Sequence, residues 1–381
     1  GVVDPNNDSN FYGFMQYGTY LFFSSSAGQG GTQAFLGAEL DAQNSGTGNW
    51  ITPLAINNDS EVYSGYNRLY KFNGSGWDAI SPSFNTNIDV LEIDPSNSNN
   101  IYIAINNSIR KSIDKGVSFT TLATTFINNI TSIEVNNNNS NVIYVTTSGF
   151  GGGVYKSIDG GSSFININEN LPVVTKNMIK HRPNDPINTL FLATHIGVFR
   201  YDDNTTSWEE FNNNLPNTSV RDLAINDIEN VIIAGTYGRG IWKSDMGTIQ
   251  LASDDVRLES ISNPINNNII CGDFRPTILV KNNGQNTITS IDFTYKLNNG
   301  ADIFYTWNGN LASLESISVS LPNLSLTKGE YNLEIEATIA NDTFSSNNNG
   351  QSTFYINKSG IAGDINNFES NEDDLITYNT E

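Results

Sequence analysis

Val90-Leu-Glu-Ile-Asp-Pro95 opens the stretch of sequence that decides the fold, and Asn100-Ile-Tyr-Ile-Ala-Ile105, Ser108-Ile-Arg-Lys-Ser-Ile-Asp114 and Ser118-Phe-Thr-Thr-Leu122 continue it. Each piece is short, alternates apolar with polar residues, and is rich in β-branched or aromatic side chains. Asn, Gly, Ser or Pro residues separate the pieces. Alternation with a period of two is typical of β-strands, so the stretch predicts a unit of four short strands.

This unit recurs along the chain at a spacing of roughly 40 to 47 residues, which is the length of one four-stranded propeller blade. Its third strand returns as Leu69-Tyr-Lys71, Val154-Tyr-Lys156, Val198-Phe-Arg200 and Ile241-Trp-Lys243. Its fourth strand opens with an aromatic residue at Trp77, Phe119, Phe164 and Trp208. We therefore predict an all-β chain in which residues 1–246 form β-propeller blades.

The two ends of the repeat region are predicted to be incomplete. A fainter first copy, at Phe11-Tyr12 and Leu21-Phe-Phe23, lacks most of its first strand, and the last copy stops after its third strand at Asp245. The two ends could complement each other, or earlier blades could precede Gly1. The sequence favours earlier blades and an incomplete ring.

Two copies share a turn of the form Ser-x-Asp-x-Gly-x-x-aromatic between the third and fourth strands. We expect the Asp carboxylate to accept backbone N–H groups, the Gly to adopt a positive φ, and the aromatic ring to fill the gap between blades. The pattern resembles the Asp box of neuraminidase-like repeats, which is a structural device far from a propeller's central site. The residues assigned this structural role are Ser112, Asp114, Gly116, Phe119, Ser157, Asp159, Gly161 and Phe164.

Longer phrases resemble the sortilin-like, Asp-box propellers of secreted Bacteroidota proteins. They are Trp50-Ile-Thr-Pro-Leu-Ala-Ile56 and Ala234-Gly-Thr-Tyr-Gly-Arg-Gly-Ile-Trp-Lys-Ser244, and the resemblance covers residues 1 to about 246. It implies a large exported protein, often carried by the type IX secretion route and released or held at the cell surface. Secretion or surface-attachment machinery would then be among its partners.

A second domain is predicted over residues 252–357, where the repeat gives way to seven short alternating strands typical of a β-sandwich. The phrase Val280-Lys-Asn-Asn-Gly284 resembles the adhesion-related (CARDB-like) immunoglobulin-like domains found beside such propellers. The single cysteine, Cys271, is expected to be a small buried apolar residue. Residues 358–381 read as an acidic linker or as the start of a further domain.

Charge and composition exclude several functions. A net charge of −21 repels phosphate backbones, so nucleic acid is not an expected partner, and the chain has no apolar run of about 18 residues to span a membrane. An acidic surface can collect structural calcium. Two histidines, His181 and His195, are too few for an expected zinc site.

No catalytic residues are predicted. A sialidase needs a central arginine cluster, but Arg68, Arg110, Arg200 and Arg239 lie at or beside third strands, which is the wrong layer for one. A glycoside hydrolase needs two carboxylates. Asp94, Glu134 and Asp227 follow first strands and are the candidates for such a pair, although acidic turn residues are common there.

The loops between second and third strands should lie at one end of the propeller, opposite the Asp boxes, and loops on a rigid scaffold often carry function. Their side chains suit a sugar or a peptide, although the same residues could instead pack adjacent blades. The candidate ligand contacts are Tyr66, Phe150, His195, Tyr237 and Arg239. The leading hypothesis is a non-catalytic binding or spacer module. The rivals are a carbohydrate-active propeller, either a glycoside hydrolase or a glycan-binding domain, and a structural carrier for an upstream enzyme domain.

Overall fold

The computed structural model describes residues 1–29, 31–38, 47–205 and 207–357, and the predicted linker at 358–381 lies outside them. The described chain is all-β apart from two short 3-10 turns, which confirms the predicted fold class. It divides into two compact units, Gly1–Thr248 and Ile249–Glu381. Each is described below by itself.

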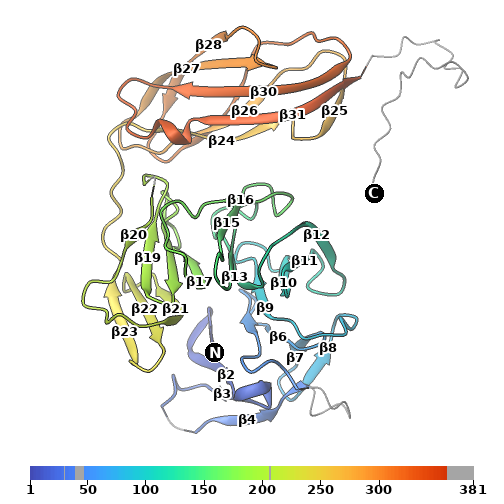
Figure 1. Ribbon diagram of the computed structural model, residues 1–381, viewed down its shortest axis with the longest axis vertical. Helices are drawn as coiled ribbons and strands as arrows, with labels where there is room; N and C mark the ends of the chain where they lie inside the picture. Colours follow the sequence, from blue (N-terminus) through green and yellow to red (C-terminus); the bar gives the residue numbers. More distant parts are fainter. Residues whose placement is uncertain (30, 39–46, 206, 358–381) are drawn as a thin grey trace, which may run out of the picture. The chain divides into compact units, whose positions relative to one another are not determined.

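The first unit contains six small antiparallel sheets that follow one another along the chain, as the colours of Figure 1 show. The first sheet holds β1 (Val2–Asp4), β2 (Asn7–Phe14), β3 (Tyr20–Ser24) and β4 (Gln33–Leu36); the second holds β5 (Leu54–Ile56), β6 (Val62–Gly65), β7 (Leu69–Phe72) and β8 (Trp77–Ala79). The third holds β9 (Val90–Ile93), β10 (Ile101–Ile105), β11 (Ser108–Ser112) and β12 (Thr120–Thr125); the fourth holds β13 (Ile130–Val135), β14 (Ile143–Thr147), β15 (Val154–Ser157) and β16 (Ile165–Asn166). The fifth holds β17 (Lys176–His181), β18 (Leu190–Thr194), β19 (Gly197–Tyr201) and β20 (Glu209–Glu210); the sixth holds β21 (Val220–Asn226), β22 (Val231–Thr236) and β23 (Ile241–Asp245).

Consecutive sheets pack face to face, with their first strands innermost. Contacts join β1 to β5, β5 to β9, β9 to β13, β13 to β17 and β17 to β21. A separate apolar cluster lies in each of the five gaps. Within the described residues no comparable packing joins β21 to β1. The unit is therefore a β-propeller whose blades run in one continuous series.

The first copy of the repeat is more complete than the sequence indicates. A short β1 pairs with β2, through Val2 with Tyr12 and Val3 with Phe11, so that five sheets are four-stranded rather than four. Asp4 ends this strand early because its carboxylate accepts the Asn6 N–H at 3.0 Å in a tight turn. The sixth sheet has three described strands, as the sequence predicts.

In the second to fifth sheets, the aromatic residue that opens the fourth strand packs in the gap between two sheets. Trp208 is 2% exposed and packs with residues of both the fourth and fifth sheets. Its indole N–H donates to the Ile167 carbonyl at 2.8 Å. Phe119 likewise meets Phe84 edge to face, at a centroid distance of 5.5 Å. These rings fix the spacing of neighbouring sheets.

The two Ser-x-Asp-x-Gly turns have nearly identical geometry. The Asp114 carboxylate accepts the Ser118 N–H at 2.9 Å, and Ser112 Oγ accepts the Gly116 N–H at 2.8 Å. The corresponding bonds from Ser163 to Asp159 and from Gly161 to Ser157 are both 2.9 Å. Gly116 and Gly161 have φ angles of 90° and 96°, which L-residues with a side chain rarely adopt.

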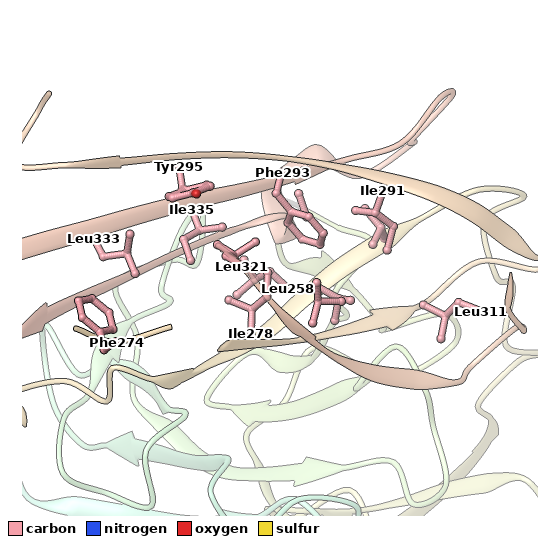
Figure 2. Packing of buried hydrophobic residues seen from close by; sticks show 14 of the residues in the cluster. Leu258, Phe274, Ile278, Ile291, Phe293, Tyr295, Leu311, Leu321, Leu333 and Ile335 are labelled. Carbon is pink, nitrogen blue, oxygen red and sulfur yellow. The ribbon is translucent and has the colours of Figure 1, made fainter. Parts of the chain in front are cut away.

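The second unit is a β-sandwich. Its three-stranded sheet contains β24 (Val256–Asn263), β26 (Thr277–Asn282) and β29 (Ser316–Ser320); its five-stranded sheet contains β25 (Asn268–Cys271), β31 (Asn349–Asn357), β30 (Gly329–Thr338), β27 (Ile288–Leu297) and β28 (Ile303–Leu311). The facing side chains form one apolar core, in which Phe293, Ile335 and Ile278 lie between the two sheets (Figure 2).

One strand of the sandwich is missing from the sequence-based prediction. β25 is only four residues long, pairs in parallel with β31, and stands at the edge of its sheet. Ile270 points toward the core, so Cys271 beside it points outward and is exposed. The expectation that Cys271 is buried is therefore wrong, because side chains alternate across an edge strand.

Candidate functional site

The loops between second and third strands lie beside the links that enter the same sheets. Backbone hydrogen bonds join Ser148 to Asn129 at 2.8 Å, His195 to Thr175 at 3.2 Å, and Tyr237 to Ser219 at 2.8 Å. We call this part of the propeller, made of the second-to-third-strand loops and the inter-sheet links, the loop end. The Asp-box turns connect third to fourth strands and so lie at the other end.

Phe150 stands at the tip of a glycine-rich loop, residues 148–153, and is 93% exposed. The loop is tightly folded: the Gly152 N–H donates to the Gly149 carbonyl at 3.1 Å, and the Gly153 N–H donates to Thr147 Oγ1 at 2.8 Å. A Cβ at Gly152 would lie 2.3 Å from the Thr147 carbonyl oxygen, so only glycine fits there. The backbone thus holds a large apolar ring out in water.

The buried side chain of Lys176 anchors this loop. It is buried, and its ammonium donates to the carbonyls of Gly152 at 2.8 Å and Pro172 at 3.1 Å. Burial lowers the pKa of this ammonium. A buried cation held only by carbonyl oxygens is costly to place, and here it joins the Phe150 loop to the next inter-sheet link.

Tyr237 and Arg239 belong to a second exposed loop. Tyr237 is 74% exposed, and the Arg221 guanidinium lies 5.6 Å from its ring centroid. The loop closes through the Thr236 N–H, which donates to the Gly240 carbonyl at 3.0 Å. Arg239 is also exposed, while its carbonyl accepts the Trp242 indole N–H at 2.9 Å. Both side chains predicted here are therefore open to solvent.

His195 is exposed on the loop between β18 and β19, but Tyr66 is not part of this surface. Tyr66 is 1% exposed, packs between the first and second sheets, and donates its hydroxyl to the Gly18 carbonyl at 2.6 Å. The expectation that Tyr66 offers an open stacking face is wrong. Tyr66 follows β6 directly and is equivalent in register to the buried Thr147 and Thr194, and its ring lies in the gap beside Phe14.

Two further aromatic residues at the loop end were not predicted. Tyr17 lies between β2 and β3, Trp50 lies on the link to β5, and their rings meet edge to face at 5.2 Å. Both are exposed. Tyr17 lies on the second-to-third-strand loop of the first copy, and Trp50 lies on the link that follows this copy. These positions in the repeat could have identified both residues as part of the loop end.

The carboxylates considered for hydrolysis are held by structural partners. Asp94 is buried and accepts the Ser96 N–H and the Asn100 amide, each at 2.9 Å. Glu134 pairs with Lys180 at 2.6 Å. Asp227 is exposed and accepts the Asn184 amide at 3.1 Å.

Glu92 is the most perturbed acid of the first unit. Burial raises its pKa well above the ordinary value, Lys180 opposes the rise, and Glu134 adds to it. These three side chains come from the first strands of the third, fourth and fifth sheets, so a small charged cluster lies along the inner strands.

Within residues 1–29, 31–38, 47–205 and 207–357, no three His, Cys, Asp or Glu side chains gather as metal ligands would. No helix there is long and apolar enough to cross a membrane.

No protein-family model and no curated protein matches the chain. A GH74 enzyme of Niastella koreensis is similar in structure, with 17% identity, a TM-score of 0.45, and coverage of 61% of this chain and 41% of that chain. The extracellular domain of a hybrid two-component system protein from B. thetaiotaomicron has 15% identity and a TM-score of 0.40, covering 90% and 54%. YCF48 from Cyanidioschyzon merolae has 13% identity and a TM-score of 0.37, covering 49% and 61%. This chain thus spans less than two thirds of each, and at these identities and TM-scores none of them assigns it an activity.

Proposed function

We propose that this propeller is a non-catalytic binding module of a large secreted or cell-surface protein, and that its loop end binds a glycan or a peptide segment. The observation that carries the proposal is the presentation of Phe150. A glycine-rich backbone, a conformation open only to glycine and a buried lysine together hold this ring 93% exposed. The exposed rings of Tyr17, Trp50 and Tyr237 belong to the same end.

Removing these exposed aromatic rings from water would favour the binding of a ligand. Covering an exposed Phe side chain is worth about 1.5–3 kcal/mol, so several rings with polar neighbours can supply most of a micromolar affinity. Aromatic faces beside hydroxyl and amide groups suit the apolar faces of sugars and the side chains of peptides.

The resemblance to sortilin-like, Asp-box propellers and to adhesion-related immunoglobulin-like domains supports an extracellular setting. Export by the type IX route and attachment to the cell surface belong to this proposal. The acidic composition suits such an environment, and structural calcium would bind the acidic surface rather than a preformed cluster of ligands.

The experiment is a glycan array and a random-peptide display screen with the 381-residue chain. Phe150→Ala and Tyr237→Ala should each weaken the binding of a selected ligand about tenfold, while the thermal midpoint stays unchanged because both rings are exposed. Ile228→Ala is the matched control, since Ile228 is an equally exposed apolar residue on a first-to-second-strand loop at the other end. Equal binding by all three variants would contradict the proposal.

Carbohydrate hydrolysis is the second candidate, and the raised pKa of Glu92 is the observation that favours it. A carboxyl group that stays protonated near neutral pH is what a general acid requires. Turnover of sialosides or β-glucans that is lost in Glu92→Gln, Asp94→Ala or Asp227→Ala would establish this function. If no turnover is detected at high protein concentration, the non-catalytic binding module is the better supported function.

A further inference from the structure

The outer edge of β23 is exposed in a way that no other third strand is. In the four preceding sheets, the residue at the start of the third strand is buried: Leu69, Ile109, Val154 and Val198 are at most 3% exposed. The equivalent residue of the sixth sheet, Ile241, is 79% exposed. Register establishes the equivalence, because Ala234 pairs with Trp242 as Leu192 pairs with Phe199.

A cavity of about 280 Å³ lies beside this strand, between the fifth and sixth sheets. Its walls are mainly apolar, and they come from both sheets. The residues that line it include Val198, Phe211, Leu215, Leu223, Ala234 and Trp242.

The cavity occupies the position that the Trp208 ring fills one sheet earlier. Trp208 packs among Val154, Ile167, Leu171, Ile179, Leu192 and Phe199. Each has an equivalent in the cavity wall, which in the same order are Val198, Phe211, Leu215, Leu223, Ala234 and Trp242. Hydrogen bonds support the match: the Ile167 N–H donates to Val154 at 2.9 Å, and the Phe211 N–H donates to Val198 at 2.8 Å.

The fourth strands of the second to fifth sheets share one sequence pattern. An aromatic residue is followed three positions later by an apolar residue, as in Trp77-Asp-Ala-Ile80, Phe119-Thr-Thr-Leu122, Phe164-Ile-Asn-Ile167 and Trp208-Glu-Glu-Phe211. All four strands pair with their third strands in the same register. The residue two places after the aromatic one lies opposite a third-strand residue that is equivalent to Trp242. These third-strand residues are Tyr70, Arg110, Tyr155 and Phe199.

A polar residue follows the apolar one in three of the four strands and completes the pairing. Asn212 Oδ1 accepts the Val198 N–H at 2.7 Å, Asn168 Oδ1 accepts the Val154 N–H at 2.8 Å, and Ser81 Oγ accepts the Leu69 N–H at 2.9 Å. The Ile241 N–H is the equivalent donor at the edge of the sixth sheet.

We propose that the sixth sheet takes up an extended segment of another polypeptide as its fourth strand. The segment carries the pattern aromatic-x-x-apolar-Asn/Ser, with its aromatic ring in the cavity and its backbone paired to β23. Strand addition of this kind gives affinity through main-chain hydrogen bonds and specificity through the pocket. The site lies on the outer edge of the propeller and goes beyond the loop-end binding proposed above.

The test uses a fluorescently labelled peptide with the sequence of residues 160–171, which contains Phe164-Ile-Asn-Ile167-Asn168. We expect saturable binding to the 381-residue chain, measured by fluorescence polarisation, and slower amide exchange of β23 in the complex. The same peptide with Phe164→Ala should bind at least about tenfold more weakly, because the ring supplies the buried anchor. No binding, or equal binding by the two peptides, would overturn the proposal.

Two protein variants test the site itself. Ala234→Phe fills the cavity and Ile241→Pro removes the edge N–H, so each should weaken peptide binding at least about tenfold. Ile113→Ala removes a comparably exposed apolar side chain, 72% exposed, from the third sheet, outside both proposed sites; it is the control and should bind normally. Sedimentation velocity examines the alternative occupant: a dimer that the peptide does not displace would show that a second copy of the chain covers the edge, and would overturn the proposal.

Discussion

Replacing Trp208 by alanine tests whether the ring between two sheets holds the propeller together. The side chain is 2% exposed, touches both neighbouring sheets, and donates a hydrogen bond to Ile167. Trp242 provides a matched control, because it has the same side chain on the next sheet but is 37% exposed.

The expected loss follows from buried area. A buried Trp removes about 200 Å² from water, which at 25 cal/mol per Å² is about 5 kcal/mol. Measured Trp-to-Ala losses in cores are about 3–5 kcal/mol, because the surroundings relax in part. We therefore expect Trp208→Ala to lower the free energy of unfolding by about 4 kcal/mol. By the same area estimate Trp242, which is 37% exposed, buries about 130 Å², so Trp242→Ala should cost about 2–3 kcal/mol.

Differential scanning calorimetry can measure both variants. For a unit of this size, about 4 kcal/mol corresponds to a fall in midpoint of about 10 °C. The β-sandwich, residues 249–357, is a separate compact unit and should keep its own transition, so it serves as an internal reference. A midpoint for Trp208→Ala within about 2 °C of the parent protein, or equal to that of Trp242→Ala, would refute the reasoning.

Three further predictions concern single side chains. Burial alone would raise the pKa of Glu61, but hydrogen bonds from Lys71, Asn57, Lys115 and Tyr63 lower it to about 2. Because the folded-state pKa is depressed, Glu61 stabilises the fold by up to about 3 kcal/mol above pH 4.5, and this stabilisation is lost as the pH falls toward 2. Acid titration of the Glu61→Gln variant should lack this loss of stability. Lys176→Met removes the ammonium donor from the Gly152 and Pro172 carbonyls, although the Pro172 carbonyl keeps the Val174 N–H at 2.9 Å. It should lower the free energy of unfolding by about 1–3 kcal/mol, with faster amide exchange in residues 148–153; unchanged exchange there would show that the lysine does not anchor the loop. Cys271 should react with a maleimide in the native protein at a rate typical of an exposed thiol, and protection until unfolding would contradict its placement on β25.

The repeat allowed the fold of the first unit to be predicted because propeller blades depend on local patterns. Strand alternation, turn residues and the aromatic residue of the fourth strand are all readable within about 45 residues. The sequence pattern was less informative for short strands. β25 has four residues and lies outside the repeat, so it carries too little alternation to be recognised, whereas Val2–Asp4 is recognised only as the end of a strand.

Side-chain direction in the loops was harder to predict than the loops themselves. Phe150 and Tyr237 are exposed as expected, whereas Tyr66, which lies on the corresponding loop of an earlier copy but is equivalent in register to Thr147 and Thr236, is buried. The difference lies in contacts distant in sequence: the Tyr66 hydroxyl reaches Gly18, 48 residues earlier, where a Cβ would lie only 2.5 Å from it. No local pattern contains that contact.

Position within the blade therefore separates structural from functional aromatic residues better than residue type does. A ring that opens a fourth strand packs against two sheets: Trp208 is 2% exposed, and Trp77, Phe119 and Phe164 are half-buried. The Tyr66 ring, at the start of a second-to-third-strand loop, is buried where Gly18 and Gly37 of the first sheet leave room for its hydroxyl. Where the loop is itself glycine-rich and anchored, as at Phe150, the ring remains in water. The sixth sheet differs from both cases. The residues that surround the aromatic ring in the preceding sheet have equivalents there, and they line an open cavity. The repeat that builds the fold thus also provides a site where an added strand can bind.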